Sequence, residues 1–176
     1  MKMTTLVEKF LDEDNILILH GDKFFYGKAT IGNNDKVYPA IQYTVDEEPG
    51  ENDDWAKWLF ENYKFNLTAE NEFILSLLHE LGHHYTLCYF EMNVAEKTTE
   101  IEEKMIDDLL DQFNDDWEQM RKKVNEYHFN LPHEKLATEW AIASYNANIK
   151  YMRKWSSRFN SALKHYRKNK TLKIDY

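Results

Sequence analysis

One apolar segment, from about Ala69 to Phe90, constrains the fold of this chain more than any other. Thr68 is a suitable N-cap for a helix here, and Glu70 and Glu72 match the positive end of the helix dipole. The apolar side chains of this segment are Phe73, Ile74, Leu77, Leu78 and Leu81. The pattern predicts a partly buried helix from which bulk water is excluded.

The whole composition favours helices, with a small sheet near the N-terminus. Five Gly and three Pro in 176 residues are too few for a turn-dense β-sandwich. Three β-rich runs, Ile16 to His20, Lys23 to Thr30 and Val37 to Val45, predict a three-stranded antiparallel meander. Because Pro39 cannot donate a ladder hydrogen bond, we expect the third strand at an edge. The expected fold is α+β and mainly helical, in a single domain over residues 1–176.

Further helices are predicted on both sides of this segment. The patterns that predict them are Leu6, Val7, Phe10 and Leu11 at the N-terminus, then Trp55, Trp58 and Leu59, and Leu136, Ala137, Trp140 and Ala141 after Pro132. Between them, a charged stretch at about 95–126 has apolar residues in mostly four-residue steps and predicts an acidic helical insertion. A basic helix is expected at about 150–170.

The central helix carries the sequence His79-Glu80-Leu81-Gly82-His83. Residues four apart share a helix face, so both imidazoles can bind one metal ion about 2 Å away. Glu80 suits a general base that takes a proton from a water molecule on the metal. Small Gly82 allows another element to approach the helix closely. Zinc is the expected cofactor, and a hydrolase the expected activity.

A hydrolytic zinc site usually has three protein ligands and leaves the fourth position open, so a third donor is needed. A third histidine six residues after His83 is absent, because Tyr89 stands there. Glu134 is the best candidate, since it lies in the first turn of a predicted helix with Ala137 and Ala141 on the same face. The predicted ligands are thus His79, His83 and Glu134.

Other residues are weaker candidates for the site. Glu139 is the alternative third ligand, and His133 and His84 follow it. His84 is rotated about 100° from His83 on the helix, so we expect it to flank the cleft. His20 and His128 have no partner at an informative spacing, and structural roles are expected for both. The candidates for stabilising an oxyanion are Tyr127, Tyr145 and His84.

The segment Phe73 to His83 resembles the active-site helix of the ImmA/IrrE-type zinc metallopeptidases. Glu134-x-x-Ala137-x-x-Trp140-Ala141 resembles their downstream Glu-x-x-Ala-x-x-Phe-Ala segment. The resemblance implies a minimal zincin of gluzincin type, with the third ligand on a following helix. It also implies an edge strand, here Val37 to Val45, that lines the cleft and pairs with an extended peptide. Thr138 stands where those proteins commonly have an acidic or amide residue that orients a ligand.

Charge is distributed unevenly along the chain, whose formal net charge is −9. Acidic residues gather between Glu96 and Asp116, whereas the C-terminal segment from Lys150 is basic. One alternative to an enzyme is therefore a catalytically inactive zincin-like module that sequesters a protein or nucleic-acid-binding partner through its charged helices. Nucleic-acid binding by the basic helix is less favoured, because Tyr151, Trp155 and Phe159 recur as a core stripe.

The expected location is the cytoplasm. The single Cys88 cannot form an intramolecular disulfide, and the first residues show no signal peptide. No window has about 18 consecutive apolar residues, so no membrane span is expected. The expected partner is a protein or peptide substrate. The sequence does not predict an oligomeric state.

Overall fold

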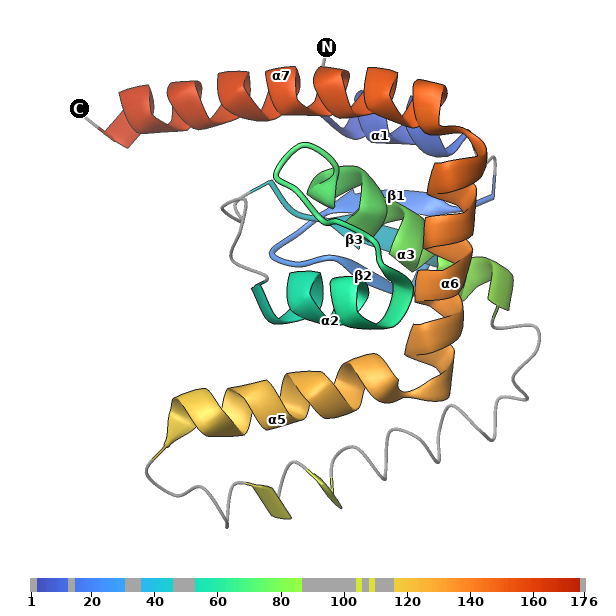
Figure 1. Cartoon of the computed structure of the whole chain (residues 1–176). Helices are drawn as coiled ribbons and strands as arrows, with labels where there is room; N and C mark the ends of the chain where they lie inside the picture. The colour runs from blue at the N-terminus through green and yellow to red at the C-terminus, as the bar shows by residue number, and fades with distance from the viewer. Residues whose placement is uncertain are drawn as a thin grey trace.

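The computed structural model describes residues 3–12, 15–30, 36–45, 53–86, 104–105, 108–109 and 116–174. Its elements are α1 (Met3–Leu11), β1 (Leu17–His20), β2 (Phe25–Thr30), β3 (Val37–Tyr43), α2 (Asp53–Tyr63), α3 (Glu72–Thr86), α5 (Trp117–Asn130), α6 (Pro132–Ala147) and α7 (Ile149–Ile174). Figure 1 shows the small sheet beside α3, with α7 and α5 on opposite sides of this centre. The α+β, mainly helical class is confirmed.

The sheet is mixed, so the predicted antiparallel meander is wrong. The strand order is β1-β3-β2, in which β1 runs parallel to β3 and β2 runs antiparallel to it. The connection from Gly21 to Phe24 carries the chain across the end of β3, where Gly21 N–H donates to the Tyr43 carbonyl at 2.9 Å. Gln42 Nε2 fixes this crossing by donating to Asp22 Oδ1 at 3.1 Å and to the Lys23 carbonyl at 3.2 Å.

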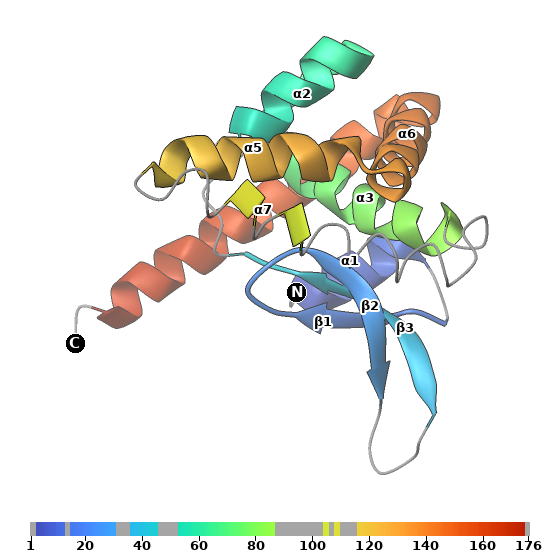
Figure 2. The same ribbon diagram turned by 90° about the horizontal axis from the view of Figure 1, so that it is seen from below.

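The expectation that the third strand lies at an edge is also wrong, because β3 is the central strand. Pro39 is nevertheless accommodated. The parallel pairing with β1 begins only at Ala40, so at Pro39 the strand has β2 as its sole neighbour among the described strands. The missing N–H therefore leaves no gap in the β1–β3 ladder. The edges of the sheet are β1 and β2, and Figure 2 shows β2 and β3 extending together away from the helices.

Helix α3 lies at the centre of the core, as its apolar sequence predicts. Ten of its fifteen residues are buried, from Phe73 to Thr86. It contacts the strands β2 and β3 and the helices α6 and α7. The helix begins at Glu72 rather than at Ala69, so the prediction that Thr68 is its N-cap is wrong. Thr68 instead holds the preceding turn through its main chain: its carbonyl accepts from the N–H groups of Asn71 and Glu72, and Asn71 Oδ1 accepts from Thr68 N–H.

Aromatic packing joins the two ends of the described chain. Phe10 of α1 contacts Trp155 and Phe159 of α7 with ring centroids 5.5 Å apart in both pairs. Trp155, Phe159 and Leu163 are buried, which confirms the predicted core stripe, although Tyr151 is 47% exposed. Among the described helices, none is long and apolar enough to span a membrane.

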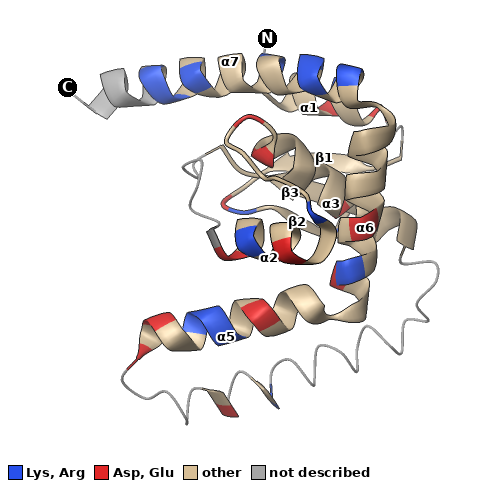
Figure 3. Cartoon of the chain, viewed as in Figure 1, with Lys and Arg blue, Asp and Glu red and all other residues tan. Residues whose placement is uncertain are grey.

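The charged segments are described only in part. Helix α5 begins at Trp117, with Asp116 as its N-cap, and most of the acidic insertion predicted at 95–126 lies outside the described residues. Helix α7 contains the predicted basic helix and carries no Asp or Glu, and Figure 3 shows Lys and Arg along it. Partner binding by these charges stays a prediction.

Candidate metal centre

Helices α3 and α6 approach each other closely at Gly82. A Cβ built on Gly82 would lie 2.5 Å from the carbonyl oxygen of Ala137 and 3.0 Å from its Cα. Ala137 and Ala141 are fully buried, so small residues line both sides of this helix crossing. The predicted close approach is confirmed, and it brings the first turn of α6 alongside His79 and His83.

Gly82→Ala is expected to lower the free energy of unfolding by about 1–3 kcal/mol, because the new methyl group meets backbone atoms that cannot rotate away. Urea denaturation of the metal-free protein measures this change. The matched control is Gly27→Ala, because the three atoms nearest to its Cβ would all belong to the exposed side chain of Phe25. Equal stability of the two variants would contradict the tight helix crossing.

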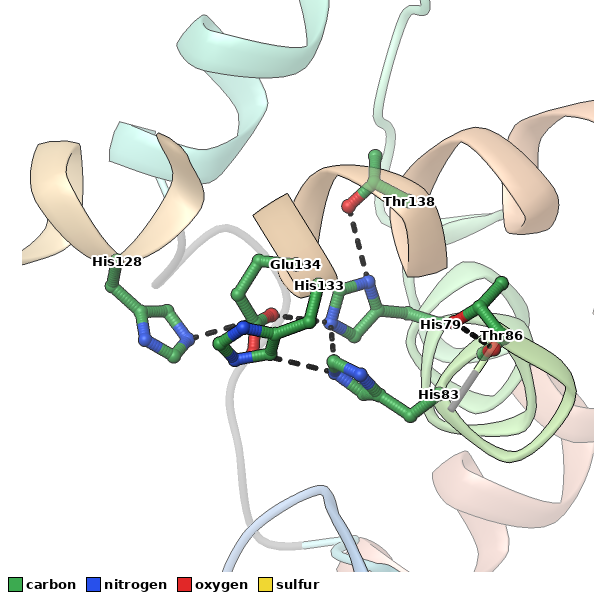
Figure 4. Close-up of polar contacts among 8 residues, drawn as sticks. His79, His83, Thr86, His128, His133, Glu134 and Thr138 are labelled. Atoms are coloured by element: carbon green, nitrogen blue, oxygen red, sulfur yellow. Dashed lines mark hydrogen bonds and ion pairs between the residues drawn. The ribbon is translucent and has the colours of Figure 1, made fainter. Parts of the chain in front are cut away.

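The three predicted metal ligands lie together. His79 Nε2 is 2.9 Å from Glu134 Oε2 and 3.2 Å from His83 Nε2, and His83 Nε2 is 3.4 Å from Glu134 Oε1. Figure 4 shows the two imidazoles of α3 facing the carboxylate of α6. Ligand atoms around a tetrahedral metal with bonds of about 2.0–2.1 Å are separated by about 3.3 Å. The spacing of these three side chains therefore fits one small metal ion.

The protonation states also suit a cation. Burial lowers the pKa of His79, although Glu134 opposes this, so the imidazole is neutral and can offer a lone pair. Burial alone would raise the pKa of Glu134, but hydrogen bonds from His133, His79 and His83 hold it well below its usual range. A neutral imidazole and an ionised carboxylate are the forms that bind metals.

Thr138 orients the first of these ligands. Its Oγ1 lies 3.1 Å from His79 Nδ1, and the residue is 2% exposed. When a metal ion is bound, an imidazole hydrogen on Nδ1, donated to Thr138, would leave the Nε2 lone pair for the metal in place of the hydrogen bond to Glu134. The ring of Trp55 closes another side of His79 at a centroid distance of 6.0 Å. The hydroxyl of Thr138 is thus placed to fix the orientation of the His79 ring.

Glu80 lies on α3 beside the ligands and is 8% exposed. Burial raises its pKa to about 8, the charge of Glu134 adds to this, and the backbone N–H of Tyr26 opposes it by donating a hydrogen bond. Tyr26 belongs to β2, so this edge strand lies directly against the candidate site. Its ring also stacks on His83 with centroids 6.4 Å apart. The edge strand at the site is therefore β2, and the prediction of Val37 to Val45 is wrong because β3 is central.

Two further histidines surround the carboxylate of Glu134. His133 Nε2 lies 3.2 Å from Oε1, and His128 Nε2 lies 3.6 Å from Oε2. No spacing in the sequence links His128 to the site, because its place depends on the turn at Leu131 between α5 and α6. The sequence makes His133 only a weak ligand candidate, although its position next to Glu134 is a usable signal.

Three of the remaining candidates make other contacts. Glu139 is exposed on α6 and accepts a hydrogen bond from the Tyr63 hydroxyl at 3.5 Å. His84 flanks the site as predicted, with Nδ1 3.1 Å from the Tyr26 hydroxyl. Tyr145 packs edge to face against Phe65. Among the described residues, His79, His83 and Glu134 form the one cluster with donor atoms mutually within 4.8 Å.

Comparison of the chain with models of protein families, with curated proteins and with solved structures finds no match. A functional assignment therefore has to come from the chemistry of the side chains in this centre.

Proposed function

We propose that this chain is a zinc-dependent hydrolase that cleaves peptide bonds, with His79, His83 and Glu134 as the metal ligands and Glu80 as the general base. The observation that supports this most is the convergence of two imidazole nitrogens and one carboxylate within 4.8 Å. Two His and one Glu suit zinc, and three protein ligands leave a position for water or substrate. The resemblance to ImmA/IrrE-type zincins points to the same chemistry.

A zinc ion held by His79, His83 and Glu134 would supply the Lewis acid that polarises a carbonyl oxygen and makes a water molecule easier to deprotonate. Glu80 then accepts the proton of the attacking water and delivers it to the amine that leaves. A base is most effective when its pKa is near the working pH: burial raises the pKa of Glu80 in the metal-free centre, and a bound cation would lower it again toward that range. The N–H of Tyr26 keeps the carboxylate in place during both proton transfers.

The edge strand β2 provides a surface for an extended substrate. Among the described strands it pairs with β3 alone, and Tyr26 brings it against Glu80 and His83. An extended peptide can add to such an edge through main-chain hydrogen bonds, which hold the backbone independently of its side chains. We infer that the substrate is an unfolded protein segment or a peptide.

The direct test is cleavage of a peptide library derived from digested proteins, analysed by mass spectrometry. The zinc-loaded chain is expected to cut the library, a chelator to stop the cleavage, and added zinc to restore it. Zinc binding at one ion per chain without any cleavage would contradict the enzymatic function, and would favour the binding-module alternative.

A further inference from the structure

His133 occupies a place that the three ligands and the general base leave unexplained. It follows Pro132 in the first turn of α6 and directly precedes Glu134. Its side chain is 27% exposed, while that of Glu134 is 9% exposed. His133 therefore lies at the solvent side of the centre, with its Nε2 turned inward to Glu134 Oε1 at 3.2 Å.

A carboxylate has two oxygens with about four lone-pair positions, and a metal ion uses only part of them. The final torsion of a Glu side chain is broad, so an otherwise free carboxylate would rotate between several orientations. A donor on one oxygen removes this freedom. His133 Nε2–H can supply that donor to Oε1, while Oε2 faces His79 Nε2 at 2.9 Å.

We propose that His133 is a positioning residue of the metal centre, which donates Nε2–H to Glu134 Oε1 and holds the carboxylate in its metal-binding orientation. The inference rests on the proposed metal site. His133 would orient Glu134 by a hydrogen bond, as Thr138 is placed to orient His79. Both His133 and Thr138 lie on α6, whereas the two ligands that they orient lie on α6 and α3. His128 lies 3.6 Å from Oε2, beyond hydrogen-bond distance, and contributes less.

The two histidines form a matched pair for the experiment. Zinc affinity is measured for the full chain by competition with a chromophoric chelator, and thermal unfolding of the metal-free variants checks their folding. His133→Ala is expected to weaken zinc binding roughly 10–100-fold, as loss of a ligand's hydrogen-bond partner does. His133→Gln keeps an N–H donor and is expected to recover most of this loss. His128→Ala should have a clearly smaller effect.

A second measurement identifies the hydrogen directly. Long-range 15N–1H NMR spectra of the zinc-loaded protein are expected to show that the imidazole of His133 carries a hydrogen on Nε2. Hydrogen on Nδ1 alone, or direct zinc coordination by His133, would overturn the positioning role. So would equal zinc affinities of His133→Ala and the unchanged chain, which would leave the metal site itself intact. Failure of the unchanged chain to bind zinc would overturn both proposals.

Discussion

Glu80→Gln is expected to bind zinc as the unchanged chain does and to lose peptide hydrolysis by a factor on the order of 10²–10⁴ in kcat/KM. Gln has nearly the same shape, and its side-chain carbonyl can still accept the N–H of Tyr26. Its amide cannot take a proton from water. Because burial already disfavours the charged form of Glu80, the neutral substitute should fold without a stability penalty.

The control for this variant is Glu139→Gln, which removes the same charge from an exposed carboxylate on α6. It is expected to retain both zinc and hydrolysis, which also excludes Glu139 as the third ligand. Zinc content is measured by elemental analysis and cleavage by the rate of product formation. Undiminished hydrolysis by Glu80→Gln would remove Glu80 from the role of general base.

His83→Ala is expected to weaken zinc binding on the order of 10³-fold, because three ligands share a binding free energy of about 12 kcal/mol. The thermal stabilisation by zinc should disappear with it. At a free zinc concentration about 1,000 times the Kd, the unchanged chain gains about 4 kcal/mol of stability. Differential scanning calorimetry with and without zinc measures the difference between the two proteins.

His84→Ala is the neighbouring control for the same measurement. His84 points to Tyr26 rather than to Glu134, with Nδ1 3.1 Å from the tyrosine hydroxyl. Its replacement should therefore leave both the zinc affinity and the zinc-dependent stabilisation nearly unchanged. Equal loss of zinc affinity in His83→Ala and His84→Ala would contradict the assignment of His83, rather than His84, as a metal ligand.

The parts of the site that depend on local spacing were predictable from the sequence. His79 and His83 share a face because of helix geometry alone. Glu134 was identified by its place in a helix whose face is formed by Ala137 and Ala141, both fully buried against α3. Gly82 indicated where another helix could approach closely, because it has no side chain. The position of each of these residues follows from the geometry of its own helix.

The parts that depend on how distant elements meet were not predictable. The connection between β1 and β2 crosses the end of β3, so three strand-forming runs in sequence order gave the wrong sheet order. Pro39 suggested an edge strand because proline cannot donate a ladder hydrogen bond. That lack would break the pairing with β1 only at residues where β1 pairs, and this pairing starts one residue later, at Ala40. His128 reaches Glu134 only through the turn between α5 and α6, which no periodicity specifies.

One zinc ion is expected to lie between α3 and α6 with an open coordination position. A crystal structure of the zinc-loaded chain, with anomalous diffraction recorded at the zinc absorption edge, measures this directly. The expected result is a single strong peak about 2 Å from His79 Nε2, His83 Nε2 and the Glu134 carboxylate, with no fourth protein ligand. A peak at another place, or a fourth protein side chain that closes the coordination, would contradict the proposed hydrolytic centre.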